Sequence, residues 1–139
     1  MAIKKVLVVD DSKTELMFMT DLLQKSGFSV KTAENAEDAF RRLAEDGFDA
    51  LSKVNDYEPH LIFCDILMPR LDGYQTCAII KRNVKFSNVP IVMLSSKDGV
   101  FDKARGRMVG SQDYLTKPFT KDQLLQTVQE LGSAKQGVV

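Results

Sequence analysis

Three carboxylates, one hydroxyl and one amine each follow a short stretch typical of a β-strand in this 139-residue chain. Asp10 and Asp11 come directly after VLVV, and Asp65 comes after LIFC. Ser95 follows IVML, and Lys117 follows QDYLT. Burying one carboxylate is costly, and two adjacent carboxylates also repel each other. A cation lying against these acids would stabilise the arrangement.

The residue types favour a hard divalent ion and a phosphoryl group. Oxygen ligands without a nearby His or Cys select Mg²⁺, which usually shares a phosphate with its protein ligands. Lys117 would supply a fixed positive charge, Ser95 would donate to a phosphoryl oxygen, and one carboxylate would act as nucleophile. Each residue also has an ordinary interpretation, such as a helix cap or a solvated lysine. Their joint placement at the ends of several runs argues for a site.

The elements that position these residues alternate along the chain. Continuous apolar strands that alternate with helices predict βαβ units and a parallel sheet covered on both faces. All strands of such a sheet end at one edge, where ligands bind. The predicted strands are 4–10, 28–33, 60–65, 89–96 and 112–118. The predicted helices are 13–27, 73–83, 100–110 and 120–131.

Residues 36–57 contain a repeat of period eleven, in which AEDAFRRLAED is followed by GFDALSKVNDY. Eleven residues are close to three helical turns, so the repeat keeps one apolar face in phase. Because Asp46-Gly47 is a turn signal, we expect two helical pieces that break there. The alternative is one long helix whose apolar stripe pairs with a second copy, giving a homodimer or a domain swap. A tolerated duplication without function is the plainer interpretation.

Composition is typical of a soluble globular domain, with 44% hydrophobic and 27% charged residues. Nineteen basic and nineteen acidic residues cancel, so net charge gives no support for nucleic acid or an anionic membrane as a partner. No apolar run approaches the ~20 residues of a membrane span. Cys64 and Cys77 lack metal-ligand spacing. We therefore expect a cytoplasmic protein.

Four motifs, taken in order, resemble the receiver domain of two-component response regulators. They are VLVVDDS, LIFCDILMPRLDGYQ, VPIVMLSSKD and GSQDYLTKPF, and they span nearly the whole chain. The resemblance implies a flavodoxin-like α/β fold, a doubly wound five-stranded parallel sheet in the order 2-1-3-4-5. It places the receiver domain at 1–131, with the enlarged segment between strands two and three and a flexible tail at 132–139.

The resemblance also assigns the site. It makes Asp65 the phosphoacceptor, and it implies that Asp10, Asp11, Asp65 and the backbone carbonyl of Leu67 hold Mg²⁺. Ser95 and Lys117 would contact the phosphoryl group.

Switching would depend on Tyr114, the aromatic expected to move inward when Ser95 moves. The Lys117–Pro118 peptide bond is expected to be cis, and Gly73 is expected to permit the turn after Asp65.

The segments MPRLDGYQTCAIIK, MLSSKDGVFDKARGRMVG and YLTKPFTKDQLL resemble stand-alone receivers of the chemosensory pathway of type IV pili and twitching motility. The first forty residues are more similar to a sibling receiver of that system. The chain is therefore interpreted as a receiver of this kind, or as a recombinant of two such proteins.

The implied partners are a histidine kinase or phosphotransfer domain and a downstream protein target. The target would bind the surface formed by the fourth helix, fifth strand and fifth helix, where Phe101, Met108 and Phe119 lie; Met108 is expected in the core. Since no output domain is expected after residue 131, output would be protein–protein contact. Water attack on the phosphoryl group should pass Leu67 and Lys97, and the bulky Leu67 predicts slow dephosphorylation.

Three other classes of protein are alternatives. A Mg²⁺-dependent aspartyl-phosphate phosphohydrolase uses the same kinds of site residue. Such an enzyme generally has a second acid two residues after the nucleophile, where this chain has Leu67. A flavodoxin-type electron carrier needs a phosphate-binding loop, and DDSKTE is acidic. A phosphorylation-independent scaffold is disfavoured by the five intact site residues. The sequence is therefore interpreted as that of a signalling phosphoacceptor rather than an enzyme.

Overall fold

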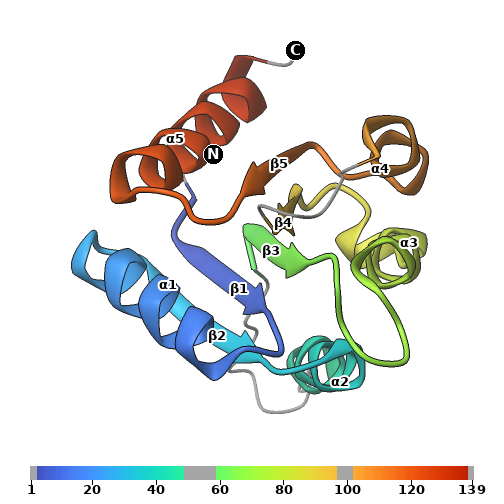
Figure 1. Ribbon diagram of the computed structural model, residues 1–139. Helices are drawn as coiled ribbons and strands as arrows, with labels where there is room; N and C mark the ends of the chain where they lie inside the picture. The colour runs from blue at the N-terminus through green and yellow to red at the C-terminus, as the bar shows by residue number, and fades with distance from the viewer. Residues whose placement is uncertain (1–2, 49–58, 97–101, 138–139) are drawn as a thin grey trace.

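A computed structural model describes residues 3–48, 59–96 and 102–137 (Figure 1). Within these residues the sheet has five parallel strands in the order β2-β1-β3-β4-β5, as expected. The strands are β1 (Lys5–Val9), β2 (Ser29–Ala33), β3 (Leu61–Asp65), β4 (Ile91–Ser95) and β5 (Asp113–Thr116). The helices are α1 (Lys13–Lys25), α2 (Ala36–Phe48), α3 (Gly73–Arg82), α4 (Lys103–Val109) and α5 (Lys121–Gly137), with a short 3-10 helix η2 (Val84–Phe86).

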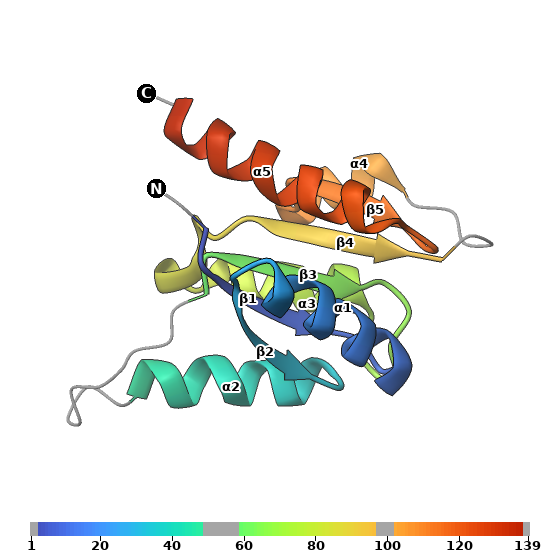
Figure 2. The ribbon, with the colours of Figure 1, turned by 90° about the vertical axis from the view of Figure 1, so that its left-hand side faces the viewer.

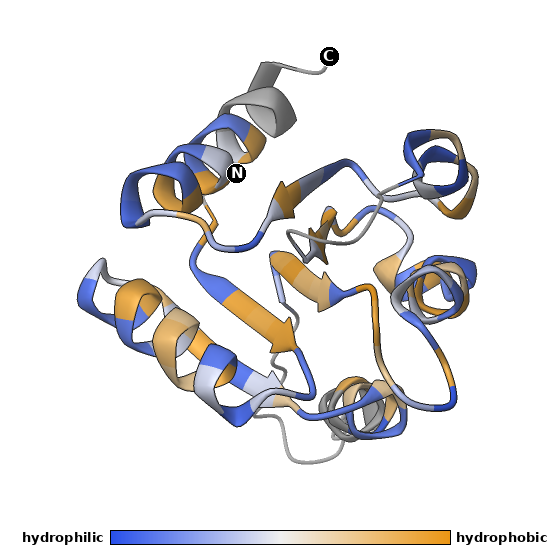
Figure 3. Ribbon diagram, in the orientation of Figure 1, coloured by the Kyte–Doolittle hydropathy of each residue, from blue (hydrophilic) through white to orange (hydrophobic). Residues whose placement is uncertain are grey.

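The sheet lies between two layers of helices. Figure 1 shows α1 and α5 on one side and α2, α3 and α4 on the other. Alternate residues of the buried strands point to opposite faces, so β1 contributes Val6 and Val8 to one core and Leu7 and Val9 to the other. Figure 3 shows the central strands in the apolar colours and the outer sides of the helices largely in the polar ones.

The strands all run in the same direction, and Figure 2 shows the arrowheads of β1, β2 and β4 at one edge of the molecule. This edge collects the residues that follow each strand, which is the arrangement expected from the sequence. Among the described residues, no helix has the length and apolar character needed to cross a bilayer.

Helix ends follow local sequence signals. The Ser12 hydroxyl accepts a hydrogen bond from the Glu15 amide at 3.3 Å, so Ser12 is the N-cap of α1. Asp72 and Gln75 form a capping box at the start of α3. Gly110 ends α4 with a φ of 94°, a conformation that favours glycine.

Two helices extend beyond their expected ends. The predicted break at Asp46-Gly47 is wrong, because α2 continues to Phe48. A glycine inside a helix costs only about 1 kcal/mol, so the turn preference of this pair is outweighed by the helix that contains it. The second half of the repeat, 49–57, lies outside the described residues, so the alternative of one long helix that pairs with a second copy stays a prediction. At the other end of the chain, α5 runs to Gly137 instead of stopping at 131.

Candidate functional site

Three acids meet at the carboxyl edge of β1 and β3. One carboxylate oxygen from each of Asp10, Asp11 and Asp65 lies within 4.8 Å of the other two. Asp10 is fully buried and Asp65 is buried, whereas Asp11 is exposed. The Asp10 Oδ1 atom accepts a hydrogen bond from the Ser12 amide at 3.0 Å, which fixes the carboxylate at the start of α1. The predicted juxtaposition of these acids is therefore confirmed.

Lys117 reaches the same cluster from the end of β5. Its Nζ atom lies 2.7 Å from Asp10 Oδ2 and 3.4 Å from Asp65 Oδ1. The Lys117 amide donates to the carbonyl of Ser95 at 2.7 Å, which ties the end of β5 to the end of β4. The peptide bond between Lys117 and Pro118 is cis, as expected.

Asp65 and Lys117 both have shifted pKa values. Burial, together with the nearby charge of Asp10, raises the pKa of Asp65 from 3.8 to about 7, although Lys117 opposes the shift. Burial acts to lower the pKa of Lys117, but the hydrogen bond to Asp10 and the charge of Asp65 raise it overall. Lys117 is therefore a stable cation, and a further cation at the acids would favour ionised Asp65. The donor set, three carboxylates within reach of one another, suits a hard divalent ion such as Mg²⁺.

Gly73 allows the backbone after Asp65 to fold back on itself. Its amide donates to the carbonyl of Ile66 at 2.7 Å. A Cβ atom at this position would lie 2.4 Å from the Asp65 carbonyl oxygen and 2.7 Å from the Cα of Ile66. Only glycine fits this approach without a shift of the backbone.

Ser95 and Tyr114 lie on β4 and β5, the two strands that follow β3 in the sheet. Ser95 ends β4 and is buried, and its hydroxyl donates to the carbonyl of Ser96 at 3.3 Å. Tyr114 lies on β5 opposite Met93 and is partly buried against the core that faces α3 and α4. The ammonium of Lys103 lies 5.5 Å from the centre of the Tyr114 ring. Ser95 therefore lies at the carboxyl end of β4, and Tyr114 lies on the adjacent strand, two residue pairs before that end.

The remaining predicted residues have different outcomes. The Leu67 side chain is 64% exposed, so it lies at the surface two residues after Asp65. Phe119 is buried and its ring centre lies 6.0 Å from that of Phe18 on α1. Met108 was expected in the core, but it is 86% exposed because Gly106 is the α4 residue that is buried. Lys97 and Phe101 lie outside the described residues.

Sequence reasoning missed Arg70. Its backbone has a φ of 70°, which is unusual for a residue with a side chain. Its guanidinium lies 2.8 Å from a carboxylate oxygen of Glu37 in the first turn of α2. Nothing in the local residue types pointed to this conformation or to this ion pair.

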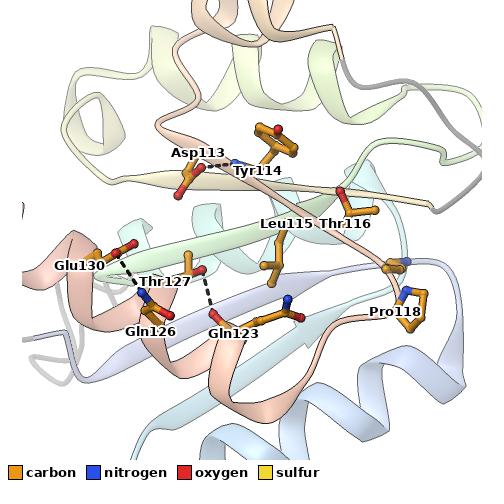
Figure 4. Close-up of a pocket in the computed structure, with 10 residues that line it drawn as sticks. Asp113, Tyr114, Leu115, Thr116, Pro118, Gln123, Gln126, Thr127 and Glu130 are labelled. Carbon is orange, nitrogen blue, oxygen red and sulfur yellow. Dashed lines mark hydrogen bonds between the residues drawn. The ribbon is translucent and has the colours of Figure 1, made fainter.

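A groove runs along β5 and α5 beside the site. Its volume is about 660 Å³, and Lys117 and Pro118 form its end nearest the acids. Figure 4 shows Tyr114 and Leu115 pointing away from each other along β5. The groove is lined by Asp113, Tyr114, Leu115, Thr116, Lys117, Pro118, Gln123, Gln126, Thr127 and Glu130.

Comparisons with known proteins agree with the fold and the motifs. The family model described as the response regulator receiver domain matches residues 6–129. Protein PilG of Pseudomonas aeruginosa is 57% identical over 121 residues, covering 87% of this chain and 82% of that protein. Protein PilH of the same organism is 34% identical over 124 residues, covering 89% and 93%.

A solved structure of the Vibrio cholerae chemotaxis protein CheY4 superimposes with a TM-score of 0.80 at 28% identity, covering 93% of this chain and 98% of that chain. The matched family model covers most of the chain and includes all three acids, Ser95 and Lys117. The chain therefore belongs to the response regulator receiver domain family.

Proposed function

We propose that this receiver accepts a phosphoryl group on Asp65 from the phosphohistidine of a histidine kinase or phosphotransfer domain, in a Mg²⁺-dependent reaction. The observation that carries the proposal is the cluster of Asp10, Asp11 and Asp65, whose carboxylate oxygens lie within 4.8 Å, with the Lys117 ammonium 3.4 Å from Asp65. The product would control contact with a downstream protein.

In the transfer step, a carboxylate oxygen of Asp65 forms a bond to phosphorus while the nitrogen–phosphorus bond of the donor breaks. The donor keeps the electron pair as a neutral or solvent-protonated imidazole, and Asp65 becomes an acyl phosphate. Lys117 neutralises charge on the transferred group, and Ser95 donates a hydrogen bond to it.

Asp10, Asp11, Asp65 and the backbone carbonyl of Leu67 would hold the ion. Bound Mg²⁺ would offset the charge of the acids and of the incoming phosphoryl oxygens.

The output would depend on Ser95 and Tyr114. Movement of Ser95 toward the phosphoryl group would leave room for Tyr114 to move inward, as a shift between two populations. Tyr114 also lines a pocket of about 210 Å³ with Lys103 and Arg107 of α4, so such a shift would change the surface between α4 and β5. A protein target is therefore proposed to bind the surface of α4, β5 and α5.

The names of the similar proteins support a pathway. PilG and PilH belong with the pilus receivers that the sequence resembles, so we place this chain in a chemosensory pathway for type IV pili and twitching motility, in the cytoplasm. The similarity to PilG extends over 121 residues. The idea that the chain combines two receivers stays a prediction, as does a homodimer through 36–57.

A phosphohydrolase remains the alternative, and the geometry around Asp72 disfavours it. The Asp72 Oδ1 atom accepts from the Gln75 amide at 2.8 Å, and Oδ2 lies 3.6 Å from Arg105. Asp72 is thus engaged in capping α3 rather than placed as a second catalytic acid, and position 67 is leucine. A slow signalling phosphoacceptor fits these residues better than a hydrolase does.

The test is to incubate the protein with Mg²⁺ and acetyl phosphate and to measure intact mass. The wild type should gain one phosphoryl group, and Asp65→Asn should gain none. Asp21→Asn is the matched control, because Asp21 is an exposed acid on α1 that pairs with Lys25. A wild type that stays unmodified, or an Asp65→Asn variant that is modified equally, would overturn the proposal.

A further inference from the structure

The first turn of α4 is held by residues that begin α3. The Asp102 amide donates to the Tyr74 hydroxyl oxygen at 2.9 Å. The Arg105 guanidinium lies 4.4 Å from the centre of the Tyr74 ring and 3.6 Å from Asp72 Oδ2. Three contacts therefore connect the stretch Asp72–Tyr74 to the N-cap and first turn of α4.

The stretch Asp72–Tyr74 also packs against the backbone of Asp65, the proposed phosphoacceptor. Gly73 donates to the Ile66 carbonyl at 2.7 Å, and there is no room for a side chain between Gly73 and the Asp65 carbonyl. Tyr74 is the next residue, and it is buried in the core that faces α3. A change in the backbone at Asp65 and Ile66 would thus be passed to a rigid, buried ring.

Beyond its first turn, α4 also contacts α3 at its C-terminal end. This helix has seven residues, and Gly106 is its one buried residue. At its C-terminal end, the Cys77 thiol lies 3.5 Å from the Val109 carbonyl, and the Lys81 side chain packs near Gly110. Exposed side chains cover its outward side, including Ala104, Arg107 and Met108. α3 therefore contacts both ends of α4, and the Lys103 ammonium near the Tyr114 ring adds a contact with β5 in the first turn.

We infer that Tyr74 and Arg105 form a clamp that couples the backbone at Asp65 to the position of α4, by a route separate from Ser95 and Tyr114. This inference rests on the proposed phosphorylation of Asp65. Tyr74 is a positioning residue, because its hydroxyl accepts a hydrogen bond from the Asp102 amide and acts through it. The clamp fixes where α4 begins, and phosphorylation would move α4 through α3.

The test compares wild type, Tyr74→Phe and Arg105→Gln with two matched controls. Tyr114→Phe removes a hydroxyl from the other proposed route, and Arg107→Gln removes a guanidinium from an exposed position of the same helix. The first readout is amide hydrogen exchange of α4 in the unmodified proteins. The second is the change in amide chemical shifts on adding Mg²⁺ and beryllofluoride, measured for α4 and for β5.

In Tyr74→Phe, the Gly106 and Arg107 amides should exchange about ten-fold faster than in wild type, and Arg107→Gln should match wild type. On adding beryllofluoride, Tyr74→Phe should lose at least half of the shift changes in α4 and keep those in β5. Tyr114→Phe should show the opposite pattern.

Unchanged exchange in Tyr74→Phe, or α4 shift changes equal to wild type, would overturn the clamp. If the wild-type protein shows no beryllofluoride response at all, the proposed function fails, and the coupling fails with it. Exchange in the unmodified variants separates that outcome from failure of the clamp itself, because it does not depend on phosphorylation.

Discussion

The ammonium of Lys117 lies closer to Asp10 than to Asp65, at 2.7 Å from Asp10 Oδ2 against 3.4 Å from Asp65 Oδ1. Lys117 and Asp10 are 107 positions apart in sequence, at the ends of β5 and β1. Asp10 is fully buried, so Lys117 is the cation that offsets its charge among the described side chains. Lys117 therefore has a structural role before any phosphoryl group arrives.

Replacing Lys117 with Met should destabilise the metal-free protein. The Asp10 carboxylate would stay buried without its partner, and breaking a buried pair in this way costs about 3 kcal/mol. Urea unfolding in EDTA measures the change, and Lys121→Met, at an exposed position of α5, is the control.

Two further measurements test the cause. The double variant Asp10→Asn/Lys117→Met should be more stable than Lys117→Met, because the unpaired charge is gone. Adding MgCl₂ should stabilise Lys117→Met more than it stabilises wild type. If the double variant is no more stable than the single one, the charge argument is wrong.

The raised pKa of Asp65 predicts a pH-dependent stability in metal-free buffer. The pKa is about 7 in the folded protein and 3.8 in the unfolded chain, so the folded state binds more protons between these values. The free energy of unfolding should therefore fall as the pH rises from 3.8 to about 7. Asp65→Asn removes this dependence and should be more stable than wild type above pH 7, by on the order of 2 kcal/mol.

Denaturant unfolding at several pH values, with EDTA present, measures this difference. Below the unfolded-state pKa, the two proteins should differ least. A stability difference that stays constant across the pH range would contradict the expected titration of Asp65.

Gly73→Ala should destabilise the fold, since the new methyl group would lie 2.4 Å from the Asp65 carbonyl oxygen. A backbone shift is needed, and we expect a loss of about 2–4 kcal/mol together with slower phosphorylation. Gly132→Ala is the matched control in α5, where a Cβ atom would lie 3.9 Å from Ile3 Cδ1. It should stabilise the protein by up to about 1 kcal/mol, as alanine does in a helix. Equal effects at the two positions would refute the crowding argument.

Leu67→Asn should accelerate loss of the phosphoryl group. The exposed apolar side chain two residues after Asp65 hinders placement of the attacking water, whereas an amide can hydrogen-bond to it. The wild-type phosphoprotein should last minutes or longer, and the variant should lose its phosphoryl group several-fold faster by intact mass. Val84→Asn, at an 87% exposed position on η2, is the control. A rate unchanged by Leu67→Asn would count against this role.

Much of the site could be predicted from the sequence because it depends on local patterns. Apolar runs form strands, and in a parallel sheet the residues that follow the strands share one edge. Asp10, Asp11 and Asp65 were therefore expected together, and their oxygens lie within 4.8 Å. The caps Ser12 and Gly110 are likewise local, since each depends on hydrogen bonds within its own helix end.

Contacts between distant elements were decided only by the tertiary structure. The sequence did not predict that Lys117 lies nearer Asp10 than Asp65, because that depends on how β5 and β1 are placed across the two strands between them, β3 and β4. Nor did it predict the hydrogen bond from Asp102 to Tyr74. Met108 is exposed because the packing of α4 on α3 buries Gly106 instead, and a seven-residue helix gives too short a pattern to show this. Strand patterns determine which residues reach the edge of the sheet, whereas the packing of whole elements determines which atoms touch.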